Sequence, residues 1–199
     1  MNMRRLAVGS MCALLAVVTW RANAQEKGEP SGDDMMNAWM KANAANEHHQ
    51  VLAKMAGKWK TRSRFRTSPE APWSESSGVS ELKMIMGGKY LIEHLSGDMM
   101  PGMPFEGMGI TGYDNTKKKY TSAWIDSMST GIMTSLGTID ESKKVITFHG
   151  TIDDPMTGQM NKPVKTVFQL INDSKYVIEM YDKDANGDWY KTMEVAYTK

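Results

Sequence analysis

Cysteine, long apolar runs and an excess of charge of either sign are scarce in this sequence. The only cysteine, Cys12, lies in an N-terminal segment that we expect to be removed from the mature protein. The mature chain would then form no disulfide and offer no thiolate as a nucleophile or metal ligand. The formal net charge is +1, so no global charge attracts the chain to nucleic acid. After residue 24, no stretch approaches the roughly 20 apolar residues of a membrane-spanning helix, and we predict no membrane span.

The N-terminal segment has the three parts of a secretion signal. Arg4 and Arg5 give a positive start, residues 6–20 are apolar, and Ala22-Asn23-Ala24 supplies the small residues that signal peptidase accepts. We therefore predict a signal peptide over 1–24 that is cleaved after Ala24. The protein would be exported and become periplasmic or extracellular. An uncleaved N-terminal anchor is the alternative.

The next segments are predicted to be a tether and a helix. Residues 25–32 are polar and are expected to form the tether. Residues 33–56 are expected to form one α-helix, since Asp33 and Asp34 supply favourable negative charge at its start and apolar residues recur at helical spacing. Gly57 follows the last turn.

From residue 57 the apolar and polar residues alternate with a period of two. The clearest example is Phe105–Asp126, two alternating runs joined by the polar segment Asp114-Asn115-Thr116, which is typical of a β-hairpin. Similar run-turn-run units continue to the C-terminus. Their regular spacing favours an up-and-down barrel. We predict an all-β barrel domain over 57–199, with about ten antiparallel strands preceded by one α-helix.

The first predicted strand places five cations on one face. We interpret them as a solvated outer face that also discourages edge-to-edge aggregation. A stripe that attracts anions or a partner is the alternative. The five are Lys58, Lys60, Arg62, Arg64 and Arg66.

Two sets of motifs resemble known families. Gly57-Lys58-Trp59 is similar to the Gly-x-Trp signature of lipocalins and related calycin barrels, which implies that Trp59 closes the barrel floor beneath an arginine from the last strand. No arginine follows Arg66, so the second half of that signature is missing. A longer set resembles the bacterial domain of unknown function 1579 family, placed among calycin-like barrels, from about Asn46 to the C-terminus. This resemblance implies a barrel fold and no established activity. The motifs are Gly87-Gly88-Lys89-Tyr90-Leu91, Phe105-Glu106-Gly107, Gly109-Ile110-x-Gly112-Tyr113-Asp114, Trp124-Ile125-Asp126, Asp154-Pro155-Met156-Thr157-Gly158 and Glu179-Met180-Tyr181.

No motif identifies a catalytic or metal site. There is no G-x-S-x-G, and no motif links His94 or His149 to a serine. Asp182–Gly187 resembles the first half of a calcium-binding loop, but the position that should supply a glutamate is Met193, so we interpret the segment as a hairpin turn. Axial haem ligation by a histidine and copper binding by the methionine-rich loop are weaker alternatives. We predict no catalytic residues, no metal and no cofactor.

The functional prediction is a non-catalytic barrel that binds a small apolar or amphipathic ligand. Two alternatives stay open: an enzyme that uses interior carboxylates and a histidine, and a filled structural or interaction barrel. The sequence leaves the oligomeric state open and does not show which strand face points inward. The tentative ligand-binding residues are Trp59, Glu93, Tyr113, Trp124, Glu179, Met180 and Tyr181.

Overall fold

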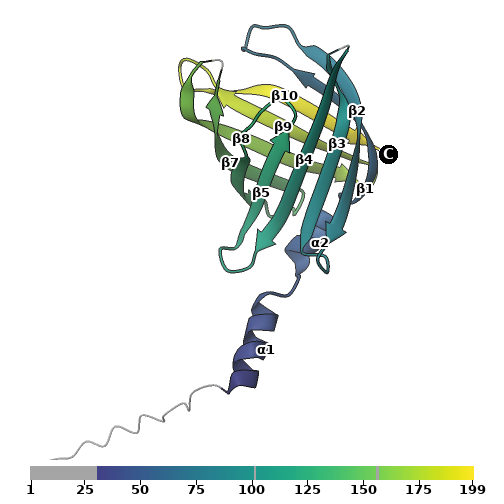
Figure 1. Ribbon diagram of the computed structural model, residues 1–199, viewed down its shortest axis with the longest axis vertical. Helices are drawn as coiled ribbons and strands as arrows, with labels where there is room; N and C mark the ends of the chain where they lie inside the picture. The colour runs from purple at the N-terminus through teal and green to yellow at the C-terminus, as the bar shows by residue number, and fades with distance from the viewer. Residues whose placement is uncertain (1–30, 101, 156) are drawn as a thin grey trace, which may run out of the picture.

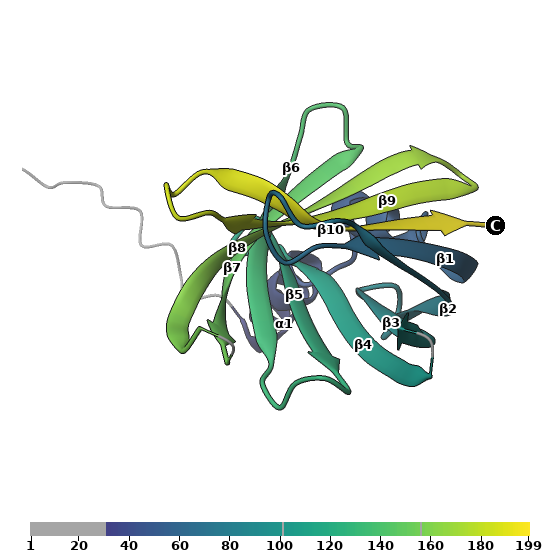
Figure 2. The same cartoon turned by 90° about the horizontal axis from the view of Figure 1, so that it is seen from above.

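The computed structural model describes residues 31–100, 102–155 and 157–199, so the predicted signal peptide lies outside the described residues. Ten antiparallel strands close into one barrel, in which each strand pairs with its neighbours in sequence and β1 pairs with β10 (Figures 1 and 2). This confirms the predicted up-and-down barrel. The elements are α1 (Gly32–Ala42), α2 (Glu47–Ala53), β1 (Gly57–Phe65), β2 (Ser74–Ile85), β3 (Tyr90–Met100), β4 (Met103–Asp114), β5 (Lys119–Asp126), β6 (Met133–Ile139), β7 (Val145–Asp154), β8 (Gln159–Asn172), β9 (Lys175–Lys183) and β10 (Trp189–Thr198).

The single helix expected over 33–56 is divided into two. Asn46 causes the division, because its side chain accepts a hydrogen bond from His48 N at 3.0 Å and so starts a new helix, as an N-cap residue does. Asn46 also donates to Asn115 Oδ1 at 2.8 Å, which ties the start of α2 to the β4–β5 turn. The first helix, α1, has no buried residue and lies beyond α2, away from the barrel (Figure 1).

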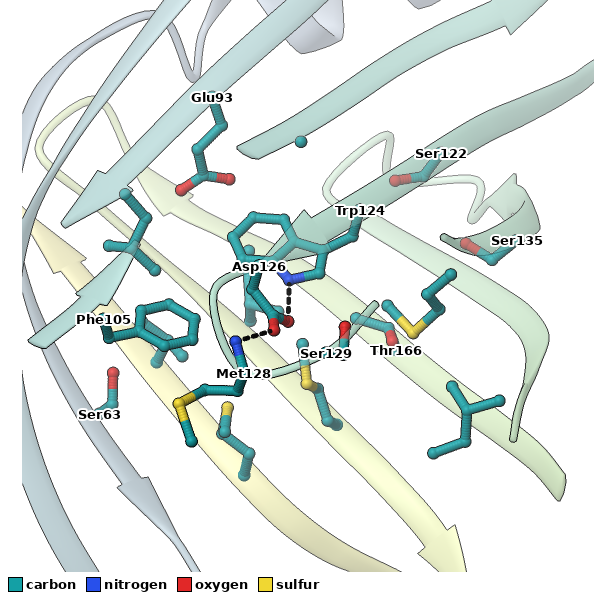
Figure 3. A pocket seen from close by; sticks show the side chains of 18 of the residues that line it. Ser63, Glu93, Phe105, Ser122, Trp124, Asp126, Met128, Ser129, Ser135 and Thr166 are labelled. Atoms are coloured by element: carbon teal, nitrogen blue, oxygen red, sulfur yellow. Dashed lines mark hydrogen bonds between the residues drawn. The ribbon is translucent and has the colours of Figure 1, made fainter. Parts of the chain in front are cut away.

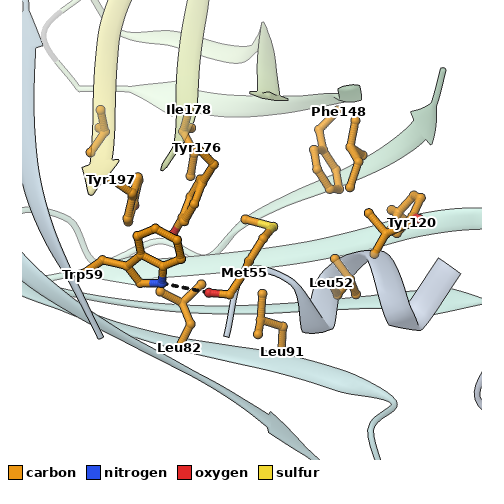
Figure 4. Packing of buried hydrophobic residues seen from close by; sticks show 13 residues of the cluster. Leu52, Met55, Trp59, Leu82, Leu91, Tyr120, Phe148, Tyr176, Ile178 and Tyr197 are labelled. Atoms are coloured by element: carbon orange, nitrogen blue, oxygen red, sulfur yellow. Dashed lines mark hydrogen bonds between the residues drawn. The ribbon is translucent and has the colours of Figure 1, made fainter. Parts of the chain in front are cut away.

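The hydrophobic core fills the end of the barrel that α2 covers (Figure 4). Leu52 of α2 is fully buried there, and Trp59 at the start of β1 is 3% exposed. The Trp59 indole donates from Nε1 to the backbone oxygen of Met55 at 2.9 Å and packs edge-on against the Tyr176 ring, with 4.8 Å between centroids. Trp59 therefore closes the floor of the barrel.

The cation that covers Trp59 comes from the last residue of the chain. Lys199 Nζ lies 4.4 Å from the centroid of the Trp59 ring. Lys199 therefore forms a cation–π contact with the tryptophan that closes the barrel floor. Among the described residues, no helix has the length and apolar character needed to cross a membrane.

Four of the five cations, Lys58, Lys60, Arg62 and Arg64, lie on the outer face of β1, and Arg66 follows the strand. Trp59, Thr61 and Ser63 alternate with them and point inward. Arg62 forms an exposed ion pair with Glu75 at 2.7 Å, and Arg64 pairs with Glu194 at 3.0 Å. These two cations therefore bind acidic residues of the neighbouring strands β2 and β10.

Candidate functional site

A cavity of about 1060 Å³ occupies the barrel above the core, toward the end opposite α2. Its floor includes Met55, Leu82 and Leu91, which belong to the core or border it. Around its wall, short hydroxyl side chains take the inward positions of several strands, and bulky residues at these positions would fill the space. Six of them are Ser63, Ser76, Thr111, Ser122, Ser135 and Thr166, and four of these are labelled in Figure 3.

Glu93 of β3 is a buried carboxyl group in the cavity wall. Its Oε1 accepts hydrogen bonds from Ser80 Oγ at 2.7 Å and from Tyr197 OH at 2.8 Å. Burial of the carboxyl group raises the pKa of Glu93, although the two hydrogen bonds act in the opposite direction. Burial likewise raises the pKa of Tyr197, whose ring stacks on Tyr176 with 4.1 Å between centroids. Glu93, Ser80 and Tyr197 therefore form a buried, hydrogen-bonded polar group at the deep end of the cavity, and burial disfavours the charged forms of its carboxyl and phenol groups.

Trp124 and Asp126 of β5 form a second polar feature of the wall (Figure 3). The indole Nε1 donates to Asp126 Oδ2 at 2.9 Å, and Asp126 Oδ1 accepts from the backbone nitrogen of Met128 at 2.9 Å. The indole lies against the backbone of two glycines of β4: a Cβ on Gly107 would be 2.3 Å from Trp124 Cζ2, and one on Gly109 would be 3.1 Å from Cε3. Because neither glycine has a side chain, the indole lies flat on the wall and leaves the cavity open.

A lysine flanked by two carboxylates lies near the open end. Lys162 Nζ is 3.0 Å from Asp154 Oδ2 and 2.5 Å from Asp182 Oδ2. Burial of the Lys162 ammonium lowers its pKa, but its hydrogen bonds with Asp182 and Asp154 outweigh this, and the pKa lies above the ordinary value. This cation is therefore already neutralised by the protein.

The tentative ligand-binding residues divide among three places. Glu93, Trp124 and Met180 line the cavity, whereas Trp59 and Tyr113 lie at the closed end. The Tyr113 ring stacks on His48 of α2, with 3.9 Å between centroids.

Glu179 and Tyr181 lie on the outer face of β9, because the residue between them, Met180, lines the cavity. Outside the barrel, Glu179 Oε2 accepts hydrogen bonds from Tyr181 OH and Gln169 Nε2, both at 2.8 Å, and Glu179 forms an ion pair with Lys191. The described cavity wall therefore excludes these two side chains from the tentative set.

The histidines considered as catalytic or haem-ligating residues are also outside the cavity. His94 and His149 are exposed, and the residues that precede them, Glu93 and Phe148, face the cavity instead. Within the described ranges, no group of three or more His, Cys, Asp or Glu side chains is placed to hold a metal ion. Asp184 of the calcium-like segment instead accepts hydrogen bonds from the backbone of Asn186 and Asp188, as hairpin turns do.

Sequence reasoning missed three residues that carry the polar contacts of the site: Asp126 and Tyr197, which line the cavity, and Ser80, which donates to Glu93. Asp126 is two residues after Trp124 on the same strand, so the sequence does indicate that the two side chains share a face. Tyr197 and Glu93 are 104 residues apart in sequence, and no local sequence pattern predicts their contact.

Comparison with known proteins identifies a family. The profile described as a protein of unknown function, DUF1579, matches residues 44–199. The protein belongs to the DUF1579 family. No curated protein matches the chain.

Solved structures share the fold at low sequence identity. Rv2717c from M. tuberculosis is 10% identical, with a TM-score of 0.53 and coverage of 78% of this chain and 99% of the other. The S-type phycobiliprotein lyase CPES from Guillardia theta is 9% identical, with a TM-score of 0.53 and coverage of 81% and 96%. At these identities the likeness shows the shared barrel fold alone, and the calycin grouping stays a prediction.

Proposed function

We propose that this DUF1579 protein binds a small apolar or amphipathic molecule inside its barrel and does not transform it. The observation that carries the proposal is the cavity of about 1060 Å³, which reaches the upper end of the range of small-molecule sites, roughly 300–1,000 Å³. Its wall combines apolar side chains with a few polar groups, the usual composition of such sites. A phycobiliprotein lyase with this fold is in keeping with a barrel that holds a small molecule.

The alternative of an enzyme with an interior carboxylate and histidine has less support. Glu93 and Tyr197 are titratable and in contact, which is one feature that such an enzyme would need. Neither His94 nor His149 faces them, however, and Glu93 has serine and tyrosine as its partners. The alternative of a filled barrel conflicts with the cavity itself.

The test is a titration with the neutral fluorescent probe 1,6-diphenylhexatriene against two neighbouring substitutions. Ser122 lines the cavity, and Thr121 lies next to it on the outer face of β5. Ser122→Phe should fill part of the cavity and weaken probe binding at least tenfold, whereas Thr121→Phe should leave binding within twofold of the wild type. If the wild type does not bind the probe, or if both variants bind it equally well, the proposal is overturned.

Native mass spectrometry of the protein purified from its expression host gives a second readout. A bound mass that is lost on mild denaturation, and that is absent from Ser122→Phe, would identify the class of ligand.

We further propose that the protein is exported after loss of residues 1–24. The support is the charged start, the apolar stretch and the small residues before Gln25. N-terminal sequencing of the protein recovered from the periplasm of its bacterial host should begin at Gln25. Recovery in the cytoplasm with an intact N-terminus would overturn this proposal.

A further inference from the structure

The pair formed by Trp124 and Asp126 has the chemistry of an ammonium-binding site. One face of the indole lies against Gly107 and Gly109, so the other face is directed to the cavity. Asp126 accepts hydrogen bonds from the indole nitrogen and from the backbone nitrogen of Met128, both of which are neutral donors. Its negative charge is therefore held in place without being neutralised. A fixed carboxylate beside an aromatic face is an arrangement that attracts organic cations.

Among the described residues, the cavity wall contains acidic side chains and no basic ones. Five acidic residues line the cavity, of which Asp154 is paired with Lys162 and Glu93 is buried, and no lysine, arginine or histidine is among the described lining residues. The nearby Lys162 is neutralised by Asp154 and Asp182. An anionic head group would therefore lose its hydration in this cavity without gaining a cationic partner, which is costly. The five are Glu93, Asp98, Asp126, Asp153 and Asp154.

The deep end of the cavity is no better for an anion. The buried carboxyl of Glu93 and the phenol of Tyr197 lie there, and the closest groups are uncharged or acidic. Burial disfavours negative charge in this region, and for the same reason it raises the pKa of Glu93. An apolar tail or a neutral hydrogen-bond acceptor suits this end of the cavity.

We propose that the ligand is a cationic amphiphile, with an amine or quaternary ammonium head at Asp126 and Trp124 and an apolar body in the cavity. This inference rests on the proposed function and names the ligand class of the same site. Asp126 acts as the specificity-determining residue: it binds the head group directly, and Trp124 supports it through the indole face.

The experiment compares three probes that share one apolar body. These are 1,6-diphenylhexatriene, its trimethylammonium derivative and its propionate derivative, which are neutral, cationic and anionic. Binding is followed by probe fluorescence at low ionic strength. The cationic probe should bind at least tenfold more tightly than the anionic one, because a charge pair in a partly desolvated site contributes that much or more. Raising the salt to about 0.5 M should reduce the ratio through screening.

Two substitutions that remove one negative charge each provide the matched comparison. Asp126→Asn keeps an oxygen that can accept from the Trp124 indole, and Glu106→Gln removes an exposed charge on the outer face of β4. The Asp126→Asn variant should lose most of the preference for the cationic probe over the anionic probe. The Glu106→Gln variant should keep the preference.

The outcomes separate this inference from the proposed function. If the neutral probe does not bind the cavity, the proposed function fails. If the neutral probe binds but the anionic probe binds as tightly as the cationic one, the inference alone is overturned. Equal effects of Asp126→Asn and Glu106→Gln would also overturn it, since the preference would then come from overall charge.

Discussion

Gly107 is the position at which the smallest substitution should change the cavity most. An alanine there would place its methyl group 2.3 Å from Cζ2 and 2.7 Å from Cη2 of Trp124. Ordinary carbon–carbon contacts are about 3.6 Å. The strand backbone behind the new methyl group is fixed by the ladders to β3 and β5, so the indole must move by roughly 1.3 Å, and the free direction is into the cavity.

The energetic cost follows from two effects. Inserting a methyl group into a well-packed contact costs about 1–3 kcal/mol. The displaced indole would also stretch its 2.9 Å hydrogen bond to the Asp126 carboxylate. We expect Gly107→Ala to lower the free energy of unfolding by about 2–3 kcal/mol, which corresponds to a fall in Tm of roughly 4–12 °C for a chain of this length. Binding of 1,6-diphenylhexatriene should weaken at the same time.

A graded series and a double-mutant cycle show whether Trp124 carries the effect. Gly109→Ala would bring a methyl group to 3.1 Å from the indole and should cost less, and Gly32→Ala in α1 meets nothing within 4 Å and should cost nothing. Trp124→Phe lacks the Cζ2 and Cη2 atoms. In that background Gly107→Ala should be nearly neutral, which gives a coupling energy of about 1.5 kcal/mol or more by thermal and urea denaturation.

A different result would refute the reasoning. If Gly107→Ala costs the same with tryptophan or phenylalanine at position 124, the penalty belongs to the backbone of β4 and the indole is not held by the glycines. If it costs nothing in either background, the indole has room to move elsewhere, and the flat packing described here does not determine the free volume.

Three further outcomes are expected. Because the pKa of Glu93 is raised in the folded protein, the unfolded chain ionises first as the pH rises, and stability is lost above the ordinary glutamate value of about 4.3. Glu93→Gln should therefore gain stability relative to the wild type as the pH rises above that value in urea titrations, and a pH-independent difference would contradict this. Asn46→Ala should cost about 1 kcal/mol and speed hydrogen exchange over 47–53 without affecting exchange in the barrel strands. Lys199→Ala should cost about 0.5–1 kcal/mol by loss of the cation–π contact with Trp59, whereas Lys175→Ala should cost nothing, and equal costs would argue against the contact.

The barrel could be predicted from the sequence because its determinants are local. Alternation with a period of two marks each strand, and short polar turns such as Asp114–Thr116 leave each strand next to its predecessor. The closure of β1 on β10 then follows from strand number and the need to cover both edges. The cause of the break between α1 and α2 is also local, since Asn46 is a good N-cap residue. The prediction missed it because apolar residues recur at helical spacing on both sides of Asn46, which favoured one continuous helix.

The site was predictable only in part. Alternation along a strand shows which residues share a face, but it does not show which face points into the barrel. Met180 must face opposite to Glu179 and Tyr181 in any strand, so a set that contains all three cannot lie on one face. The sequence alone does not identify one residue that must point inward. The burial of Trp59 identifies the inner face of β1, which also contains Thr61. Because paired residues of neighbouring strands share a face, Tyr197, which pairs with Thr61, also points inward.

The distribution of side-chain size along the inner face explains why this barrel keeps a cavity, and it leads to a final prediction. Near α2 the inward positions carry aromatic rings that close the core, whereas above the core several inward positions, such as Ser63, Ser122 and Ser135, carry short hydroxyl side chains. Enlarging one of these should therefore fill space that is free. Ser63→Leu is expected to leave the free energy of unfolding unchanged or raise it while weakening probe binding, as measured by urea denaturation and titration. In a filled barrel the same change would cost about 1–3 kcal/mol through overpacking, and that result would restore the structural alternative.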